Sequence, residues 1–202
     1  MKDKTGFDAL PASKAFIRKF ILAKRNALAK KQINEKSAKI SKKLFSLPEF
    51  KRAKTIFTYV SFGSEASTRE IIGKSIALGK IVAVPIADFK RKKLAIVQFT
   101  SFSSMKKSRF GVPEPDSKKA KWIPASQIDL VVVPGVAFDK NCNRIGFGKG
   151  YFDRFLKTQK ATTIGLAHNF QIVKKIQAKK FDVPTDFVIT ERGTHNRRGN
   201  KM

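Results

Sequence analysis

The residues with the clearest chemistry form one run in the second half of the chain, from Arg144 to Asp153. It reads Arg-Ile-Gly-Phe-Gly-Lys-Gly-Tyr-Phe-Asp, so a glycine stands at every second position from 146 to 150. The run also contains two cations and ends on an acid. Glycines let backbone N–H groups approach an anion closely, and Arg144 and Lys149 add full positive charges. Asp153 could hold Mg²⁺, which takes oxygen ligands beside nucleotide phosphates. The run therefore predicts a phosphate-binding loop.

The run matches neither of two common nucleotide-binding patterns. A Walker A loop places Ser or Thr after its Lys, whereas Lys149 is followed by Gly150, and the dinucleotide fingerprint spaces its glycines differently. A flexible hairpin with incidental glycines is the alternative. However, the run follows an apolar segment at Ile128–Val133 and the turn Pro134-Gly135. Ligands in open α/β sheets bind outside the carboxyl ends of such strands, which favours the phosphate site.

Two helices are expected ahead of the first strand. Between Ser13 and Leu47 apolar residues recur at helical spacing, and Lys and Arg fill the opposite face. Asn34 is a candidate N-cap for the second helix. Lys14 and Arg18 are four residues apart, so they project from one face of the first helix. In a segment this rich in cations, the same spacing is equally consistent with a solvated face.

Strands and helices alternate in the rest of the chain. Strands are expected at 55–60, 81–85, 94–99, 131–133, 162–167 and around 188, helices at 68–78, 149–157 and near 172, and a rigid loop at 110–115. The segment 131–133 is wholly apolar, as in a strand buried on both faces of a parallel sheet. This order predicts an α/β fold with a mainly parallel sheet. We expect one domain over residues 1–191 and a basic, disordered tail at 192–202.

The chain is strongly basic. Its 202 residues include 43 Lys and Arg against 15 Asp and Glu, a formal charge of +28. Such a surplus attracts polyanions, so a basic nucleic-acid-binding protein without ATP turnover is the alternative function. The cations are spread along the sequence and no nucleic-acid-binding module is recognisable, which argues against a dedicated nucleic-acid partner.

Features that would indicate export or membrane insertion are missing from the sequence. No apolar run is long enough to span a bilayer, and Met1–Gly6 leads into no apolar signal segment. The single cysteine, Cys142, excludes an internal disulfide and fits a reducing compartment. We therefore expect a cytoplasmic protein with no membrane partner.

The order of these motifs resembles the 5-formyltetrahydrofolate cyclo-ligases, also called 5,10-methenyltetrahydrofolate synthetases. The central match is Pro134–Asp139 followed by Arg144–Asp153. The flanking matches are Lys14–Arg18, Ser61–Glu65 with Thr68, Gly165–Ala167 with Gln171, and Asp182 ahead of Asp186. The resemblance extends over about residues 14–191 and implies a three-layer α/β/α domain. We expect a monomer or a homodimer, and the sequence does not distinguish the two.

The resemblance also implies an activity. Members of this family use ATP and Mg²⁺ to convert 5-formyltetrahydrofolate, with or without a polyglutamate tail, to 5,10-methenyltetrahydrofolate, ADP and phosphate. The γ-phosphoryl group would go to the formyl oxygen, N10 would attack the activated carbon, and phosphate would leave. Such a reaction needs positioning and charge neutralisation rather than a protein nucleophile, which suits a run rich in cations and backbone amides.

Site residues follow from the same resemblance. Those implied to contact ATP are Lys14, Arg18, Arg144, Ile145, Gly146, Phe147, Gly148, Lys149, Gly150, Tyr151 and Phe152. Those implied to face the folate are Val60, Glu65, Phe110, Phe147, Gly148, Lys149, Gly150 and Tyr151. Arg144, Lys149 and Tyr151 would act in catalysis, and Asp153 and Asp182 would hold Mg²⁺.

Several of these residues have simpler explanations when taken alone. Val60 and Phe110 are consistent with core positions, and Tyr151 with a packed residue at the start of a helix. Glu65 and Asp182 are consistent with ordinary loop carboxylates.

Two further residues could suggest chemistry that the implied reaction does not need. His168 lies at the end of an expected strand, where acid–base catalysis is conceivable, but a hydrogen-bonded structural histidine is expected. Cys142 stands where the family commonly has glycine, in the turn before the ATP loop, and a non-glycine residue at positive φ costs energy. No catalytic role is expected for Cys142.

Overall fold

Short apolar segments form the strands at the centre of the fold. The computed structural model describes residues 13–108, 111, 113–116, 120–197 and 199. Its main sheet has seven strands in the order β12-β11-β9-β6-β1-β2-β3. The strands are β1 (Thr55–Phe57), β2 (Ile81–Asp88), β3 (Lys93–Gln98), β6 (Leu130–Val133), β9 (Thr162–Leu166), β11 (Phe187–Ile189) and β12 (Thr194–Asn196). β11, β9, β6, β1 and β2 are mutually parallel, and β12 and β3 add antiparallel edges. The prediction of a mainly parallel sheet is confirmed.

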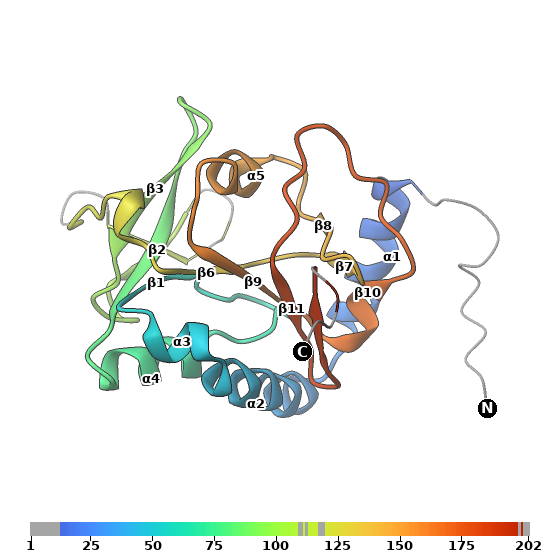
Figure 1. Cartoon of the computed structure of the whole chain (residues 1–202), viewed down its shortest axis with the longest axis horizontal. Helices are drawn as coiled ribbons and strands as arrows, with labels where there is room; N and C mark the ends of the chain where they lie inside the picture. The colour runs from blue at the N-terminus through green and yellow to red at the C-terminus, as the bar shows by residue number, and fades with distance from the viewer. Residues whose placement is uncertain (1–12, 109–110, 112, 117–119, 198, 200–202) are drawn as a thin grey trace.

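Helices cover both faces of this sheet, as Figure 1 shows. On one face lie α2 (Lys30–Ser46), α3 (Pro48–Arg52) and α4 (Arg69–Ala77), whose Ile40, Leu44 and Phe50 pack with Val132 in one core. On the other face α5 (Tyr151–Leu156) packs Phe155 and Leu156 against alternate residues of β1 and β6. All four residues of β6 are buried, as expected for its unbroken apolar sequence. The three-layer α/β/α architecture is confirmed.

A second, three-stranded sheet positions the candidate loop. It consists of β7 (Ala137–Asp139), β8 (Arg144–Ile145) and β10 (Ile172–Val173). Helix α1 (Lys14–Asn26) packs Ile17 and Ile21 against residues of this sheet in a common core. This packing brings the cationic side of α1 next to the chain that leaves β8.

Three local predictions differ from the structure. Helix α2 begins at Lys30 rather than after Asn34, because the Gln32 side chain accepts a hydrogen bond from the Ala29 N–H and caps the helix earlier. Helix α5 begins only at Tyr151, because the preceding Gly150 has φ 67° and so cannot belong to it. The short helix expected near residue 172 is a 3₁₀ turn at Asn169–Gln171, and a second such turn lies at Ala125–Gln127.

Two segments predicted to be irregular contain strands. Pro113–Pro115, expected in a rigid loop, forms β5, which pairs with β4 (Met105–Lys107). Thr194–Asn196, expected in a disordered tail, forms β12 on the edge of the main sheet. The disorder prediction is therefore wrong for these tail residues, because the exposed edge of β11 supplies backbone hydrogen bonds that composition does not reveal.

Phe138 of β7 occupies a space that two glycines leave open. Its side chain is completely buried. A Cβ atom would lie 2.4 Å from the Phe138 ring at Gly135 and 2.5 Å from it at Gly165. These distances are well inside van der Waals contact, so the ring fixes the second sheet against β9 only while both positions are glycine.

Gly165→Ala is expected to destabilise the fold by about 1–3 kcal/mol, because the added methyl group overpacks a closed core. Gly73→Ala is the matched control. Gly73 lies within α4, and the position that a Cβ would take there has no neighbouring atom within 4 Å, so alanine should add roughly 0.5–1 kcal/mol of stability. Urea unfolding measures both changes. Equal stability of Gly165→Ala and wild type would contradict the packing argument.

Candidate active site

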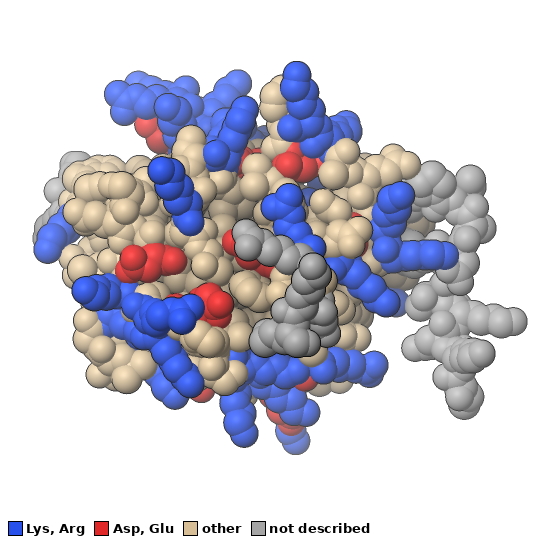
Figure 2. Space-filling model, in the orientation of Figure 1, with Lys and Arg blue, Asp and Glu red and all other residues tan. Residues whose placement is uncertain are grey.

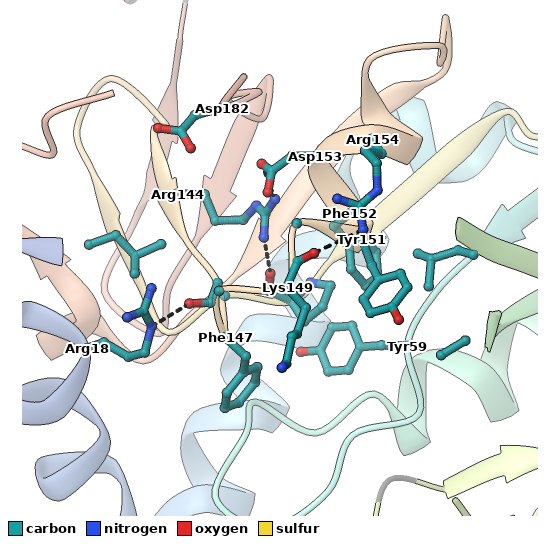
Figure 3. Close-up of a pocket in the computed structure, with 18 of the residues that line it drawn as sticks. Arg18, Tyr59, Arg144, Phe147, Lys149, Tyr151, Phe152, Asp153, Arg154 and Asp182 are labelled. Carbon is teal, nitrogen blue, oxygen red and sulfur yellow. Dashed lines mark hydrogen bonds and ion pairs between the residues drawn. The ribbon is translucent and has the colours of Figure 1, made fainter. Parts of the chain in front are cut away.

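One cavity of about 1590 Å³ brings the predicted site residues together. Its walls come from the start of α1, the segment after β1, the β2–β3 hairpin, the loop between β8 and α5, and residues 177–182 (Figure 3). Every predicted site residue that the structure describes lines this cavity. Phe110 lies outside the described residues. Segments far apart in the sequence thus meet at the loop identified from its composition.

The loop between β8 and α5 needs its glycines for its backbone path. Gly148 and Gly150 have φ 95° and 67°, values that favour glycine. Arg18 Nε donates to the Gly146 carbonyl at 2.8 Å, and Arg154 Nη2 donates to the Lys149 carbonyl at 3.0 Å. Two arginines from neighbouring helices therefore hold the loop from either side.

Arg144 lies under this loop rather than on its surface. Its side chain is 3% exposed, and Nη2 donates to Asp153 Oδ1 at 2.7 Å. Burial lowers the pKa of Arg144, and the negative charge of Asp153 acts in the opposite direction. The ion pair joins the end of β8 to the first turn of α5, so Arg144 holds the loop closed and places positive charge beneath it.

The two predicted metal ligands lie on one side of Arg144 (Figure 3). Asp182 forms an ion pair with Lys14 of α1. Burial alone would raise the pKa of Asp182, but hydrogen bonds from Lys14 and from the Lys179 N–H bring it below its ordinary value. Within the described ranges no group of three or more His, Cys, Asp or Glu side chains could hold a metal ion. Two carboxylates beside a glycine-rich loop are the kind of oxygen ligands that Mg²⁺ takes when nucleotide phosphates supply the others.

A buried carboxylate lies elsewhere in the cavity wall. Glu65 is 7% exposed, and its Oε2 accepts a hydrogen bond from the Phe62 N–H at 3.2 Å. Burial raises the pKa of Glu65 to about 7, while the charge of Arg25 and the Phe62 N–H act in the opposite direction. Tyr59 lies beside it, with its hydroxyl donating to the Ala66 carbonyl at 2.9 Å. Glu65 is therefore a buried group in an apolar setting, not a solvated loop acid.

Several residues of the cavity wall were not predicted from the sequence. Among them are Tyr59, Phe62, Phe89, Arg154 and Phe181. Phe89, on the hairpin between β2 and β3, contacts Tyr151 edge-on with 6.3 Å between ring centroids. Arg154 directly follows the predicted run, so its position and its charge could have identified it from the sequence. The aromatic residues had no distinguishing signal among 18 Phe and 2 Tyr.

His168 and Cys142 are both fully buried, and neither lines the cavity. The His168 Nε2 atom contacts the Ser64 carbonyl oxygen at 3.3 Å, and burial lowers the pKa of the ring. This confirms the expected structural role of the histidine. Cys142 has φ 62° at the turn between β7 and β8, and burial raises its pKa to about 12. Neither residue is placed for catalysis.

On the face shown in Figure 2, Lys and Arg side chains lie in several separate groups around the molecule rather than in one patch. Asp and Glu lie among them, and other residues cover much of the middle of this face. Among the described residues, no helix combines the length and apolar character that crossing a membrane requires.

Glu65→Gln is expected to change how stability depends on pH. Folding raises the pKa of Glu65 from 4.5 to about 7, so its favourable contribution is complete below pH 4.5 and is lost as the pH rises to about 7. Glutamine does not titrate, so the variant does not lose this stability over this pH range. Its free energy of unfolding relative to wild type should therefore rise by on the order of 3 kcal/mol across that window.

Urea unfolding at a series of pH values measures this difference, with Glu35→Gln at an exposed position of α2 as the control. A difference between Glu65→Gln and wild type that does not vary with pH would contradict the burial of an ionisable Glu65.

Comparison with known proteins agrees with this geometry. A profile of the 5-formyltetrahydrofolate cyclo-ligase family matches residues 11–191. The 5-formyltetrahydrofolate cyclo-ligase of Escherichia coli (strain K12) is 29% identical over 174 residues, covering 84% of this chain and 96% of the relative. The probable 5-formyltetrahydrofolate cyclo-ligase of Caenorhabditis elegans is 30% identical over 198 residues, covering 92% and 96%.

A solved structure has the same fold. The NMR structure of Aquifex aeolicus 5,10-methenyltetrahydrofolate synthetase superimposes with a TM-score of 0.80 at 30% identity, covering 94% of this chain and 95% of that one. The profile match includes α1, the loop between β8 and α5, and the segment that carries Asp182. The chain belongs to the 5-formyltetrahydrofolate cyclo-ligase family.

Proposed function

We propose that this protein converts 5-formyltetrahydrofolate to 5,10-methenyltetrahydrofolate, using ATP and Mg²⁺ and releasing ADP and phosphate. The observation that carries the proposal is the cavity itself. A glycine-rich loop with flanking cations and two carboxylates lies in the same cavity as a buried acid among aromatic residues. At about 1590 Å³ this cavity exceeds the roughly 300–1,000 Å³ of ordinary ligand pockets, which suits two substrates bound together.

The nucleotide phosphates would bind at the loop between β8 and α5. Lys149 is exposed on this loop and supplies a mobile positive charge. Arg18 fixes the loop through the Gly146 carbonyl. Asp153 and Asp182 would hold the Mg²⁺ ion, which would neutralise phosphate charge. Lys14 and Arg144, their present partners, would then remain close to the phosphates as further cations.

The folate would bind against the other wall. Glu65 could accept hydrogen bonds from the N–H groups of the pterin ring, and Val60 and Tyr59 offer apolar surface beside it. Tyr151, the first residue of α5, lines the same cavity and contacts Phe89. This arrangement would place the formyl group of the folate near the γ-phosphate.

The reaction then requires only that these residues hold the substrates in line. The γ-phosphoryl group passes from ATP to the oxygen of the formyl group carried by N5, which gives an iminium phosphate and ADP. N10 attacks the formyl carbon and loses its proton, the ring closes, and the carbon–oxygen bond breaks to release phosphate. Lys149 and the charge of buried Arg144 would stabilise the transferring group, and Tyr151 would fix the folate. No side chain needs to form a covalent intermediate.

Purified protein mixed with Mg-ATP and 5-formyltetrahydrofolate is expected to form the methenyl product, seen as a new near-ultraviolet absorbance. The signal should require ATP, because the formyl oxygen is a poor leaving group until it is phosphorylated. Absence of an ATP-dependent signal would refute the proposal. Tight, salt-sensitive RNA binding without ATP turnover would favour the nucleic-acid alternative instead.

Lys149→Ala should lower kcat/KM by roughly 100-fold or more, because it removes a cation from the transferring phosphoryl group. The side chain is exposed, so circular dichroism and the melting temperature should not change. Lys42→Ala, at an exposed position of α2, is the control. Lys149 is a cleaner target than Asp153, whose removal would leave Arg144 buried and unpaired at a cost of about 3–5 kcal/mol. An unchanged rate for Lys149→Ala would refute its assignment.

A further inference from the structure

Arg25, at the C-terminal end of α1, is a buried cation that the proposed reaction does not use directly. The residue is 4% exposed. Lys14, Arg18 and Arg25 recur at intervals of four and seven residues and therefore share one side of the helix. Lys14 contacts Asp182 and Arg18 contacts the Gly146 carbonyl. The third cation of this series has a different set of partners.

Arg25 contacts two loops that both contribute residues to the cavity wall. Its Nε donates to Ser64 Oγ at 3.1 Å, and Ser64 Oγ donates to Asn26 Oδ1 at 2.6 Å. Its guanidinium carbon lies 5.8 Å from the centroid of the Phe147 ring, within the range of a cation–π contact. One side chain thus bridges the loop that carries Glu65 and the loop that binds phosphate in the proposed function.

Arg25 is also the main opposite charge for Glu65. The titratable groups facing Glu65 are Arg25 from α1 and Tyr59 from the segment after β1. His168, at the end of β9, contacts the carbonyl of the neighbouring Ser64. Burial raises the pKa of Glu65, and the charge of Arg25 limits that rise. Removing this charge would therefore favour protonated Glu65.

We propose that Arg25 is a positioning residue that holds the Glu65 loop and the Phe147 end of the phosphate loop in one fixed relation. The proposal rests on the proposed function, in which Glu65 faces the folate and the phosphate loop faces ATP. Transfer of a phosphoryl group between two bound substrates requires both to be held in line. A misplacement of about 1 Å can cost on the order of 100-fold in rate.

The test compares Arg25→Met, Arg25→Lys and wild type. Methionine keeps an unbranched chain without charge, and lysine keeps the charge but loses the planar guanidinium. Arg52→Met, the same change at an exposed position of α3, is the control. Circular dichroism and thermal melting establish that each variant is folded.

Arg25→Met is expected to raise the KM for 5-formyltetrahydrofolate at least tenfold and the KM for ATP less than threefold. The acid limb of kcat/KM for the folate should move to higher pH by about one unit or more, because Glu65 loses its opposite charge. Arg25→Lys should keep the wild-type pH profile but lower kcat, because the charge remains while the bridge is lost. In a Glu65→Gln background, Arg25→Met should no longer shift the pH profile.

Amide hydrogen exchange supplies a readout that does not depend on turnover. Residues 61–66 and 144–150 should exchange faster in Arg25→Met than in wild type, and should be unchanged in Arg52→Met. If Arg25→Met does not fold, Ser64→Ala, which removes the acceptor of Arg25 Nε, should give the same changes to a smaller degree. Unchanged exchange in both loops overturns the proposal. In a folded, active variant, unchanged folate KM and pH profile also overturn it. If the wild-type protein shows no turnover, the proposed function is refuted, whereas the bridging role of Arg25 is still tested by hydrogen exchange.

Discussion

The pairing of Arg144 with Asp153 is the interaction on which the site depends. A guanidinium that is almost fully buried is costly unless a carboxylate meets it with good geometry. The two residues lie nine positions apart, on β8 and at the start of α5, so their contact closes the intervening loop. Gly148 and Gly150 supply the backbone angles that allow this closure. The shape of the glycine-rich loop between β8 and α5 is thus set by the neutralisation of one buried charge.

The scaffold around this pair explains why distant segments meet there. Parallel strands end at a common edge of the sheet, and the second sheet lies beside that edge because Phe138 fits against Gly165 of β9. Buried polar contacts connect the same elements: Gln171 binds the carbonyls of Gly135 and Val136, and its Oε1 accepts from the His168 N–H. His168 therefore belongs to the framework, and its burial keeps it from serving as an acid or base.

Much of the architecture could be predicted because it depends on local patterns. The apolar periodicity of α1 and α2 and the unbroken apolar sequence of β6 are short-range signals that packing did not override. The prediction of a disordered tail failed because a partner from another segment decides the outcome: the order of Thr194–Asn196 depends on the free edge of β11, which composition does not reveal. The predicted start of α2 failed for a local reason, because the Gln32 side chain caps the Ala29 N–H three residues away and Asn34 does not begin the helix.

The sequence by itself determined the chemical character of this protein: a glycine-rich loop with two cations and an acid, a pair of cations one helical turn apart, and the family to which they belong. Only the tertiary structure decided which charges are buried and what they neutralise. Arg144 lies beneath the loop instead of on it, Arg25 joins two loops, and the pKa of Glu65 is raised to about 7. The reason is that desolvation depends on neighbours from every part of the chain, and no local pattern encodes them.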